Sequence, residues 1–375
     1  MALTVSNSSN RASVWAKDVM ANVAKESFFY ANGMVSEKAG KGIVMVKNDF
    51  TSKPGGTMNF ALTAKLSGSG VDGDNTLEGN AEAITAYNFN STIQQKRQNV
   101  VLTGMLDEQK NAYNMRFDAR DKISIWMTEF LDTQFFLKAS GITSTDLTDI
   151  NGITYSADAA WGNTPNIVPV ADEAAGIGKR YVCANTSGLD ALSSSNIMTS
   201  ALLEKAALIA TTSNDPKIRP IRIKGRPYFV FVMHPSQMDD LRNASSSTFE
   251  TQLRDARQRG GDNPIFAGAE GLAYNKVLLY TNEKVCRCSS TYNFSTAGTA
   301  AGADAFRALL LGSDALVMGK AGNQAKNWVE KDDLDWDNRW GVASRFCGLI
   351  DKPYFNSIDY GVIAVDTSAT NSDFS

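Results

Sequence analysis

Histidine and cysteine are scarce in this 375-residue chain, which limits the chemistry that it can perform. His234 is the single histidine, and the four cysteines are Cys183, Cys286, Cys288 and Cys347. A structural zinc site needs about four such ligands at close spacing, whereas only Cys286 and Cys288 are neighbours, in the pattern C-R-C. We therefore expect reduced thiols in a protein made in the cytoplasm, with no metal site, no cofactor and no disulfide scaffold.

Long apolar runs and an excess of basic charge are also missing. No stretch approaches the ~18 consecutive apolar residues of a membrane span, and the first residues, MALTVSNSSNRAS, lack the basic start and apolar run of a secretion signal. Lys and Arg number 37 against 40 Asp and Glu, a formal net charge of -3. Wrapping nucleic acid by bulk charge is therefore disfavoured, although a local basic surface is not.

What the chain does contain is enough apolar material for a large core. Hydrophobic residues make up 43% and charged residues 21%, which excludes disorder throughout. At ~100–200 residues per domain, the length predicts two or three domains.

The first hundred residues predict extended elements rather than a domain. Ser13–Phe29 has helical spacing of apolar residues, and Ile43–Val46 reads as a short strand. A long β-hairpin is expected next, from the alternating strand Thr57–Leu66 to the return strand Ile84–Leu102. The Gly-rich acidic sequence between these strands predicts an exposed tip. A two-stranded ribbon is marginal alone, so we expect it to dock on a partner.

Residues 105–139 carry the strongest helical period, and Leu106 to Ala139 would span ~50 Å at ~1.5 Å per residue. The expected core face includes Ala119, Ile123, Trp126 and Phe130. A helix of this length predicts an elongated subunit.

Further along, residues 142–193 are polar and predict irregular structure. The remaining expected helices are Ser194–Thr211, Ser236–Ala244 and Ser313–Met318. The remaining expected strands are Tyr228–Met233, Lys276–Tyr280, Ala305–Leu311, Ala325–Glu330 and β segments within Val342–Val365.

Motifs with chemical meaning are weak. Gly68–Gly73 matches GxGxxG but lies in a hairpin tip rather than between a strand and a helix. The nearby Asp72, Asp74 and Glu78 fail the calcium-loop spacing, because Leu77 stands where glycine must turn the chain. His234 has no histidine partner, and no G-x-S-x-G elbow occurs. No enzyme constellation emerges.

One basic cluster stands out, with the sequence KIRPIRIKGR. It indicates either a contact between subunits or a surface that faces DNA, and the lack of interleaved aromatic residues argues against single-strand binding. The cluster consists of Lys217, Arg219, Arg222, Lys224 and Arg226.

The order of these elements resembles the major capsid proteins of tailed bacteriophages, which have the Hong Kong-97-type fold, an α+β fold. The resemblance spans nearly the whole chain and departs mainly in Ile142–Asn196. It is carried by KPGG (Lys53–Gly56), FALTAKLSGSGVDGDNTLEGNAEA, RFDARDKISIWMTEFLD, YFVFVMHPSQMDDLR, NPIFAGAEG (Asn263–Gly271), ALLLGSDAL (Ala308–Leu316) and the segment Trp328–Thr367.

The resemblance implies a structural protein of the virion that is synthesised in the bacterial cytoplasm. Copies would form hexamers and pentamers of an icosahedral shell around double-stranded DNA, with weak non-specific contact to that DNA. The arm and the E-loop would lie on neighbouring subunits, with Phe60, Leu62, Tyr87 and Phe89 as docking residues. Portal, scaffold and decoration proteins would be further partners, and no membrane is involved.

The same resemblance implies a division of the chain. The segments are an N-terminal arm (1–49), the E-loop hairpin (50–103), a P domain (104–224) with the spine helix (105–139), an A domain (225–327), return strands of the P domain (328–366) and a C-terminal tail (367–375). The alternatives are an accessory virion protein of the decoration or scaffold type and, third, a cysteine-dependent hydrolase. The former are usually shorter, and scaffolds are mostly helical.

Overall fold

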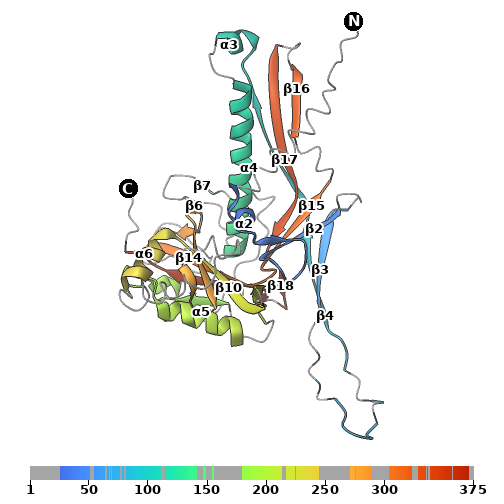
Figure 1. Ribbon diagram of the computed structural model, residues 1–375, viewed down its shortest axis with the longest axis vertical. Coiled ribbons are helices and arrows are strands. Elements are labelled where there is room, and N and C mark those ends of the chain that lie inside the picture. The colour runs from blue at the N-terminus through green and yellow to red at the C-terminus, as the bar shows by residue number, and fades with distance from the viewer. Residues whose placement is uncertain are drawn as a thin grey trace.

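A computed structural model gives the architecture of the chain (Figure 1). It describes residues 26–50, 55–63, 66–110, 115–141, 147–148, 154–155, 180–212, 217–244, 271–288, 304–322 and 328–370, apart from positions 67, 69, 77, 80, 81, 224, 275, 335, 337 and 357. Most of the helix expected at Ser13–Phe29 and most of the irregular region 142–193 lie outside the described residues.

A long helix and a narrow sheet beside it form the upper half of the molecule in Figure 1. Helix α4 (Met115–Ser140) corresponds to most of the helix expected at residues 105–139, which is wrong as a single element: its first residues form a separate short helix, α3 (Met105–Lys110). The neighbouring sheet, here the elongated sheet, has the order β1-β2-β15-β17-β16, with β5 also paired to β17. Its strands are β1 (Val35–Ser36), β2 (Val44–Phe50), β5 (Gln94–Val101), β15 (Leu316–Ala321), β16 (Trp328–Leu334) and β17 (Arg339–Asp351).

A second sheet of eight strands forms the body, with order β11-β12-β10-β14-β20-β8 and with β13 and β9 attached to β14 and β10. Helix α5 (Ser200–Thr212) and helix α6 (Pro235–Ala244) lie in this body. The strands are β8 (Tyr181–Cys183), β9 (Ile221–Ile223), β10 (Arg226–Met233), β11 (Gly271–Tyr274), β12 (Val277–Thr281), β13 (Arg287–Cys288), β14 (Ala305–Leu311) and β20 (Val362–Thr367).

The body sheet crosses the expected domain limits, because β8 and β20 come from ranges assigned to the P domain, while β15 of the elongated sheet comes from the range assigned to the A domain. Two small strand pairs and one 3-10 turn lie outside these two sheets. They are β6 (Leu147–Thr148) with β7 (Thr154–Tyr155), β18 (Tyr354–Phe355) with β19 (Ile358–Asp359), and a single 3-10 turn at Leu189–Ala191.

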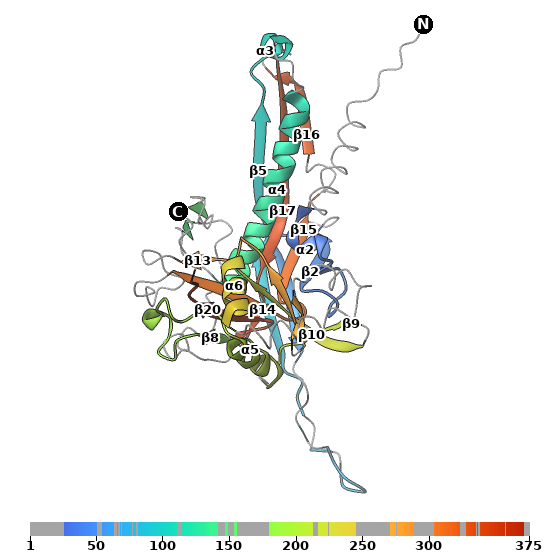
Figure 2. The ribbon, with the colours of Figure 1, turned by 60° about the vertical axis from the view of Figure 1, so that its left-hand side comes forward.

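A two-stranded ribbon projects from the foot of the elongated sheet, away from both the spine helix and the body (Figures 1 and 2). It consists of β3 (Thr57–Thr63) and β4 (Ala86–Thr92), paired in register from Thr57–Thr92 to Thr63–Ala86. The expected return strand Ile84–Leu102 is wrong as a single element. Its second half is β5, which turns upward and pairs with β17 along the spine helix.

Two other predicted elements also need correction. The helix expected at Ser313–Met318 is absent: Ser313 and Asp314 form a turn, and Leu316–Met318 begin strand β15, which pairs in parallel with β2 and antiparallel with β17. Helix α5 begins at Ser200, six residues after the expected Ser194, because Ser193, Ser195 and Asn196 bond to one another in a turn that precedes it.

The main core lies where the spine helix meets both sheets. Ala119, Ile123, Met127 and Leu131 form the buried face of α4 at steps of four residues, as a helix requires. Trp126 and Phe130 stack on each other with centroids 5.7 Å apart at the edge of this core, where both are half-buried.

The described part of the N-terminal arm packs on its own chain. The short helix α2 (Phe28–Ala31) places Phe28 and Phe29 against Phe136, with centroids 5.8 and 5.4 Å apart. Asp132 of the spine helix accepts hydrogen bonds from Ser27 Oγ at 2.6 Å and from the Phe28 amide at 3.0 Å. Residues 26–50 are therefore part of the subunit body, and residues 1–25 lie outside the described chain.

Candidate subunit-contact surfaces

The base of the ribbon is anchored on its own subunit. Met58, Phe60 and Phe89 are buried in a small cluster with Val317 and Leu349 of the elongated sheet. A Cβ at Gly319 would collide with the Met58 sulfur, so the glycine lets the ribbon lie directly on β15. This base fixes the direction in which the rest of the ribbon leaves the molecule.

The four expected docking residues therefore divide into two pairs. Phe60 and Phe89 are each 4% exposed, and Phe89 also meets Tyr354 edge-on at 5.1 Å. Leu62 and Tyr87 are paired across the two strands, two residues further along the ribbon than Phe60 and Phe89, and both are half-buried. Within the isolated subunit, only the second pair has apolar surface left for a neighbour.

Beyond the paired strands, the ribbon carries a loop without packing of its own. None of the described side chains in residues 66–85 is buried, and Leu66 and Ile84 are 56% and 71% exposed. The loop contains Asp72, Asp74, Glu78 and Glu82 and no Lys or Arg. We call residues 66–85 the acidic loop. Its exposure fits a segment that finds its contacts outside the chain.

The opposite end of the molecule exposes apolar side chains. We call this the distal end: helix α3, the start of α4, and the turn between β16 and β17, which lie together at the top of Figure 1. Trp336 in that turn is 98% exposed, Leu106 of α3 is 65% exposed and Phe117 of α4 is 50% exposed. Exposed large apolar residues grouped at one end mark a protein contact. Sequence reasoning missed Trp336, although its position in DLDWDN between two strand-like segments is a turn signal.

An ion pair between α4 and β16 stabilises the distal end. The Arg120 guanidinium binds both carboxylate oxygens of Glu330 at 3.0 Å and lies over the rings of Phe117 and Trp340. The two-point geometry holds α4 against β16. The ion pair therefore holds in place the two elements beside which the exposed residues of the distal end lie.

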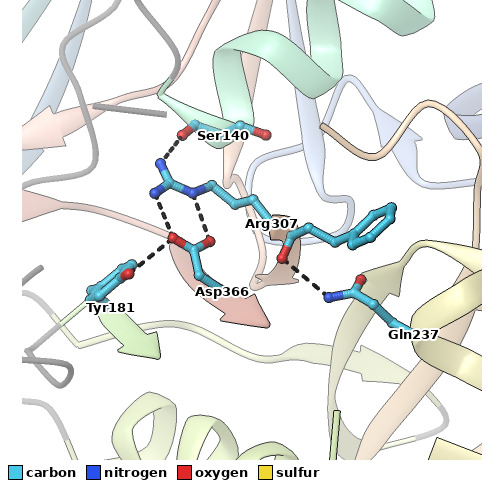
Figure 3. A network of polar contacts seen from close by, with 6 residues as sticks. Ser140, Tyr181, Gln237, Arg307 and Asp366 are labelled. Atoms are coloured by element: carbon cyan, nitrogen blue, oxygen red, sulfur yellow. Dashed lines mark hydrogen bonds and ion pairs between the residues drawn. The ribbon is translucent and has the colours of Figure 1, made fainter. Parts of the chain in front are cut away.

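A buried polar network joins the spine helix to the body sheet, as Figure 3 shows. Arg307 of β14 donates to both carboxylate oxygens of Asp366 on β20, at 2.9 and 2.7 Å, and to the Ser140 carbonyl at the end of α4, at 3.2 Å. Tyr181 of β8 donates to the same carboxylate at 3.0 Å. A cation suits the carbonyl end of a helix. Arg307 thus ties three strands and the spine helix into one joint.

A second buried pair lies in the same region. Lys352 Nζ donates to Asp359 Oδ2 at 2.9 Å, and Arg180 Nε donates to the Asp359 carbonyl at 2.6 Å. Burial lowers the pKa of Lys352, and it lowers the pKa of Arg180 to about 10, while Asp359 opposes both shifts. Paired charges of this kind specify geometry more than they add stability. They link the end of β17, strand β19 and the residue that precedes β8.

The basic cluster lies on β9 and the start of β10, at the edge of the body. Lys217, Arg219, Arg222 and Arg226 are exposed, and Lys224 lies outside the described residues. Ile221 and Ile223 on either side of Arg222 are buried, so strand alternation directs Arg222 to solvent. We call residues Lys217–Arg226 the basic hairpin.

The residues considered for catalysis are placed unfavourably for it. Burial raises the pKa of Cys183 and Cys286 to about 11, which keeps both thiols protonated and weakly nucleophilic. Burial and then the Arg287 charge lower the pKa of His234 to about 4. His234 Nδ1 faces Ser236 Oγ and its amide, at 3.1 and 3.2 Å, at the start of α6.

In the described chain, no helix is long and apolar enough to cross a membrane.

A spine helix beside an elongated sheet, a second sheet as body and a projecting ribbon define a shell-forming capsid subunit of the Hong Kong-97 type. The capsid of Ralstonia phage GP4 matches with a TM-score of 0.80 at 25% identity, over 94% of this chain and 93% of that one. The Cyanophage Pam1 capsid asymmetric unit matches with a TM-score of 0.68 at 19% identity, over 91% and 92%. The predicted fold is thereby confirmed.

Sequence comparison then gives the family. A family model described as phage capsid protein matches residues 3–371, so the chain belongs to the phage capsid protein family. The major capsid protein of Pseudomonas phage KPP25 is 28% identical over 333 residues, which are 83% of each chain. The predicted function is confirmed: the chain is a structural major capsid protein of a bacteriophage that forms the capsid shell, and it is not an enzyme.

Proposed function

We propose that copies of this chain form hexamers and pentamers, which close an icosahedral shell around double-stranded phage DNA. The observation that supports this most is the acidic loop, which lies at the end of an anchored ribbon that projects from the elongated sheet, and of which no described side chain is buried. In a ring of identical subunits, each projecting element meets a different surface of the next copy, and such contacts close on themselves.

In this proposal the ribbon is the E-loop, α4 is the spine helix of the P domain, and the body sheet with α5 and α6 forms most of the A domain. Leu62 and Tyr87 contact the neighbouring subunit, while Phe60 and Phe89 hold the ribbon on the elongated sheet of its own subunit. Residues 1–25 of the arm would reach a neighbour as well.

The chain would be made in the bacterial cytoplasm and end in the virion, with portal, scaffold and decoration proteins as further partners. A net charge of -3 suits a shell that contains DNA without binding it tightly. An accessory decoration or scaffold role loses support, because the family match spans residues 3–371 and the curated relative is itself a major capsid protein.

Negative-stain electron microscopy of the purified protein tests the proposal. We expect rings and closed shells from the full chain, and soluble folded subunits without shells when residues 67–81 are deleted. The melting temperature of the deletion variant should match that of the unassembled full chain, because no described side chain in this segment is buried. Full-sized shells from the deletion variant would refute the docking role of the loop, and a full chain that stays monomeric under all assembly conditions would refute the proposal.

A further inference from the structure

The basic hairpin is a surface with unsatisfied positive charge. Five of its ten residues are Lys or Arg, and no Asp or Glu occurs from position 216 to position 238. Within the described part of the chain, Lys217, Arg222 and Arg226 are exposed and form no ion pair. Arg219 differs, because it lies near the carboxylate of Asp314.

The hairpin is also firmly positioned. β9 pairs antiparallel with β10 through Ile223–Arg226 and Ile221–Tyr228, and β10 is the strand to which both β12 and β14 pair in the body sheet. The Arg219 carbonyl accepts from the Ser313 amide at 2.7 Å. Charged groups on so fixed a frame lose little conformational freedom when they bind.

The acidic loop is the complementary feature of the same chain. Its four carboxylates lie in a stretch without any Lys or Arg from position 66 to position 95. Asp72, Asp74 and Glu78 are exposed and form no ion pair within the described residues, whereas Glu82 accepts the Gly68 amide at 2.7 Å. Around Gly70, Gly73 and Gly79 no atom lies within 4 Å of where a Cβ would stand, so the loop is open on all sides.

These two features occupy different places on the molecule. Figure 2 shows β9 at the side of the body, while the ribbon runs down and away from it. A patch and its complement at separate places on one chain form a heterologous contact between copies, which is the kind that builds rings.

We propose that the basic hairpin of one subunit binds the acidic loop of a second copy. This inference rests on the proposed assembly and specifies which surface receives the ribbon tip. Arginines can bind carboxylates by two parallel hydrogen bonds, so Arg222 and Arg226 supply orientation as well as attraction. Opposite charges also steer the encounter of subunits before the apolar contacts form.

Double-stranded DNA is the other polyanion that could meet the basic hairpin. The second copy is favoured because a matching acidic segment is present in every subunit at equal concentration, with four carboxylates for five basic residues. A contact between copies and a contact with DNA respond differently to charge reversal, and the experiment uses that difference.

The experiment exchanges the charges of the two surfaces in the full chain. The variants are Arg222→Glu with Arg226→Glu, Asp72→Lys with Asp74→Lys, and the combination of all four. We expect each double variant to reduce the yield of shells by about tenfold or more, because the reversed charges repel their former partners at every such contact, and the combined variant to recover it. Shell yield is measured by sedimentation and electron microscopy, and a thermal melt shows that the subunits are folded.

Matched controls separate this contact from a general effect of charge. Lys122→Glu with Arg97→Glu changes the net charge equally at exposed basic residues of α4 and β5, away from both surfaces, and should assemble normally. Should the glutamates prevent folding, Arg222→Gln with Arg226→Gln provides the same test. We then expect the shell yield of the wild type to fall between about 50 and 500 mM NaCl and that of the glutamine variant to change much less.

The outcomes are distinct. Recovery in the combined variant supports the proposal. Normal shells from both double variants would overturn it while leaving the proposed assembly intact, because the wild type would still form shells. Normal shells from the Arg222→Glu and Arg226→Glu variant, together with weaker binding of that variant to added double-stranded DNA in a co-sedimentation assay, would also overturn it and assign the basic hairpin to nucleic acid.

Discussion

At the scale of single residues, the buried charges near the foot of the spine helix determine how the two halves of the subunit meet. Arg307, Asp366, Lys352 and Asp359 are all 1% exposed or less, and each pair joins segments that are far apart in the sequence or that frame a tight turn. Such pairs cost free energy when one partner is removed, because the other is left charged and buried.

Replacing Arg307 by Gln should lower the free energy of unfolding of the unassembled subunit by about 3–5 kcal/mol, since Asp366 would lose both guanidinium bonds. Urea denaturation measures this. The exposed Arg222→Gln serves as control and should change the value by less than about 0.5 kcal/mol. Equal stability of the two variants would contradict the proposed importance of the joint.

His234 gives a dependence on pH. Its pKa is about 4 in the folded chain, below the ~6.5 of an unfolded histidine. Between these values the unfolded state binds a proton that the folded state does not, so the free energy of unfolding falls as the pH falls from about 6.5 to about 4, by at most about 1.4 kcal/mol per pH unit.

His234→Asn keeps an acceptor near the Ser236 amide but does not titrate, so its loss of stability in acid should be shallower than that of the wild type. Urea midpoints measured from pH 7 to pH 4.5 give the two slopes. Parallel slopes would mean that His234 is protonated at its ordinary pKa in the folded chain.

At the scale of elements, the spine helix has a buried side and an edge that differ in their contribution to stability. Phe135 is fully buried against Phe29, with centroids 5.1 Å apart, whereas Trp126 is half-buried and stacks on Phe130. Phe135→Ala should cost about 3–5 kcal/mol and Trp126→Ala a smaller amount, because the cost follows the buried volume that is lost. Thermal melts of the two variants compare them directly; a larger loss for Trp126→Ala would place the core on the other side of the helix.

The elements that local patterns specify were predicted from the sequence. The apolar runs of β10 and β14, the alternation of β3 and the helical period of α4 all appear where expected. The resemblance to capsid proteins supplied the arrangement that these patterns alone do not.

The errors share one physical cause, which is pairing between distant segments. Residues 313–318 have an ordinary helical composition, yet β15 forms because β2, about 270 residues earlier, offers an edge to which it pairs. The split between β4 and β5 is decided in the same way by β17. Burial of Phe60 and Phe89 within the subunit depends on Val317 and Leu349, which no local pattern places beside them.

At the scale of the whole molecule, the subunit is elongated, with one proposed contact element at each end. The acidic loop lies at the lower end of Figure 1, and the ends of β16 and β17, between which Trp336 stands in the sequence, lie at its upper end. Fully exposed tryptophan is costly to leave in water and is enriched at the centres of protein interfaces. We expect the distal end to meet other subunits in the shell.

Trp336→Ala should therefore leave the melting temperature of the isolated subunit unchanged and reduce the yield of shells by about tenfold. Sedimentation of the assembled fraction measures the effect. Leu208→Ala, which removes another exposed apolar side chain from α5 of the body, is the control and should assemble like the wild type. Normal assembly of the Trp336 variant would show that this turn faces solvent in the shell.

The pairing of β5 with β17 has a consequence for synthesis on the ribosome. Residues 94–101 pair with residues 341–348, and β2 pairs with β15. Neither pair of strands can form until the later strand has been synthesised. A nascent or truncated polypeptide therefore cannot complete the elongated sheet, and the foot on which the ribbon rests stays open until translation is nearly finished. Incomplete polypeptides lack a rigidly mounted ribbon, so we expect them to be excluded from the growing shell.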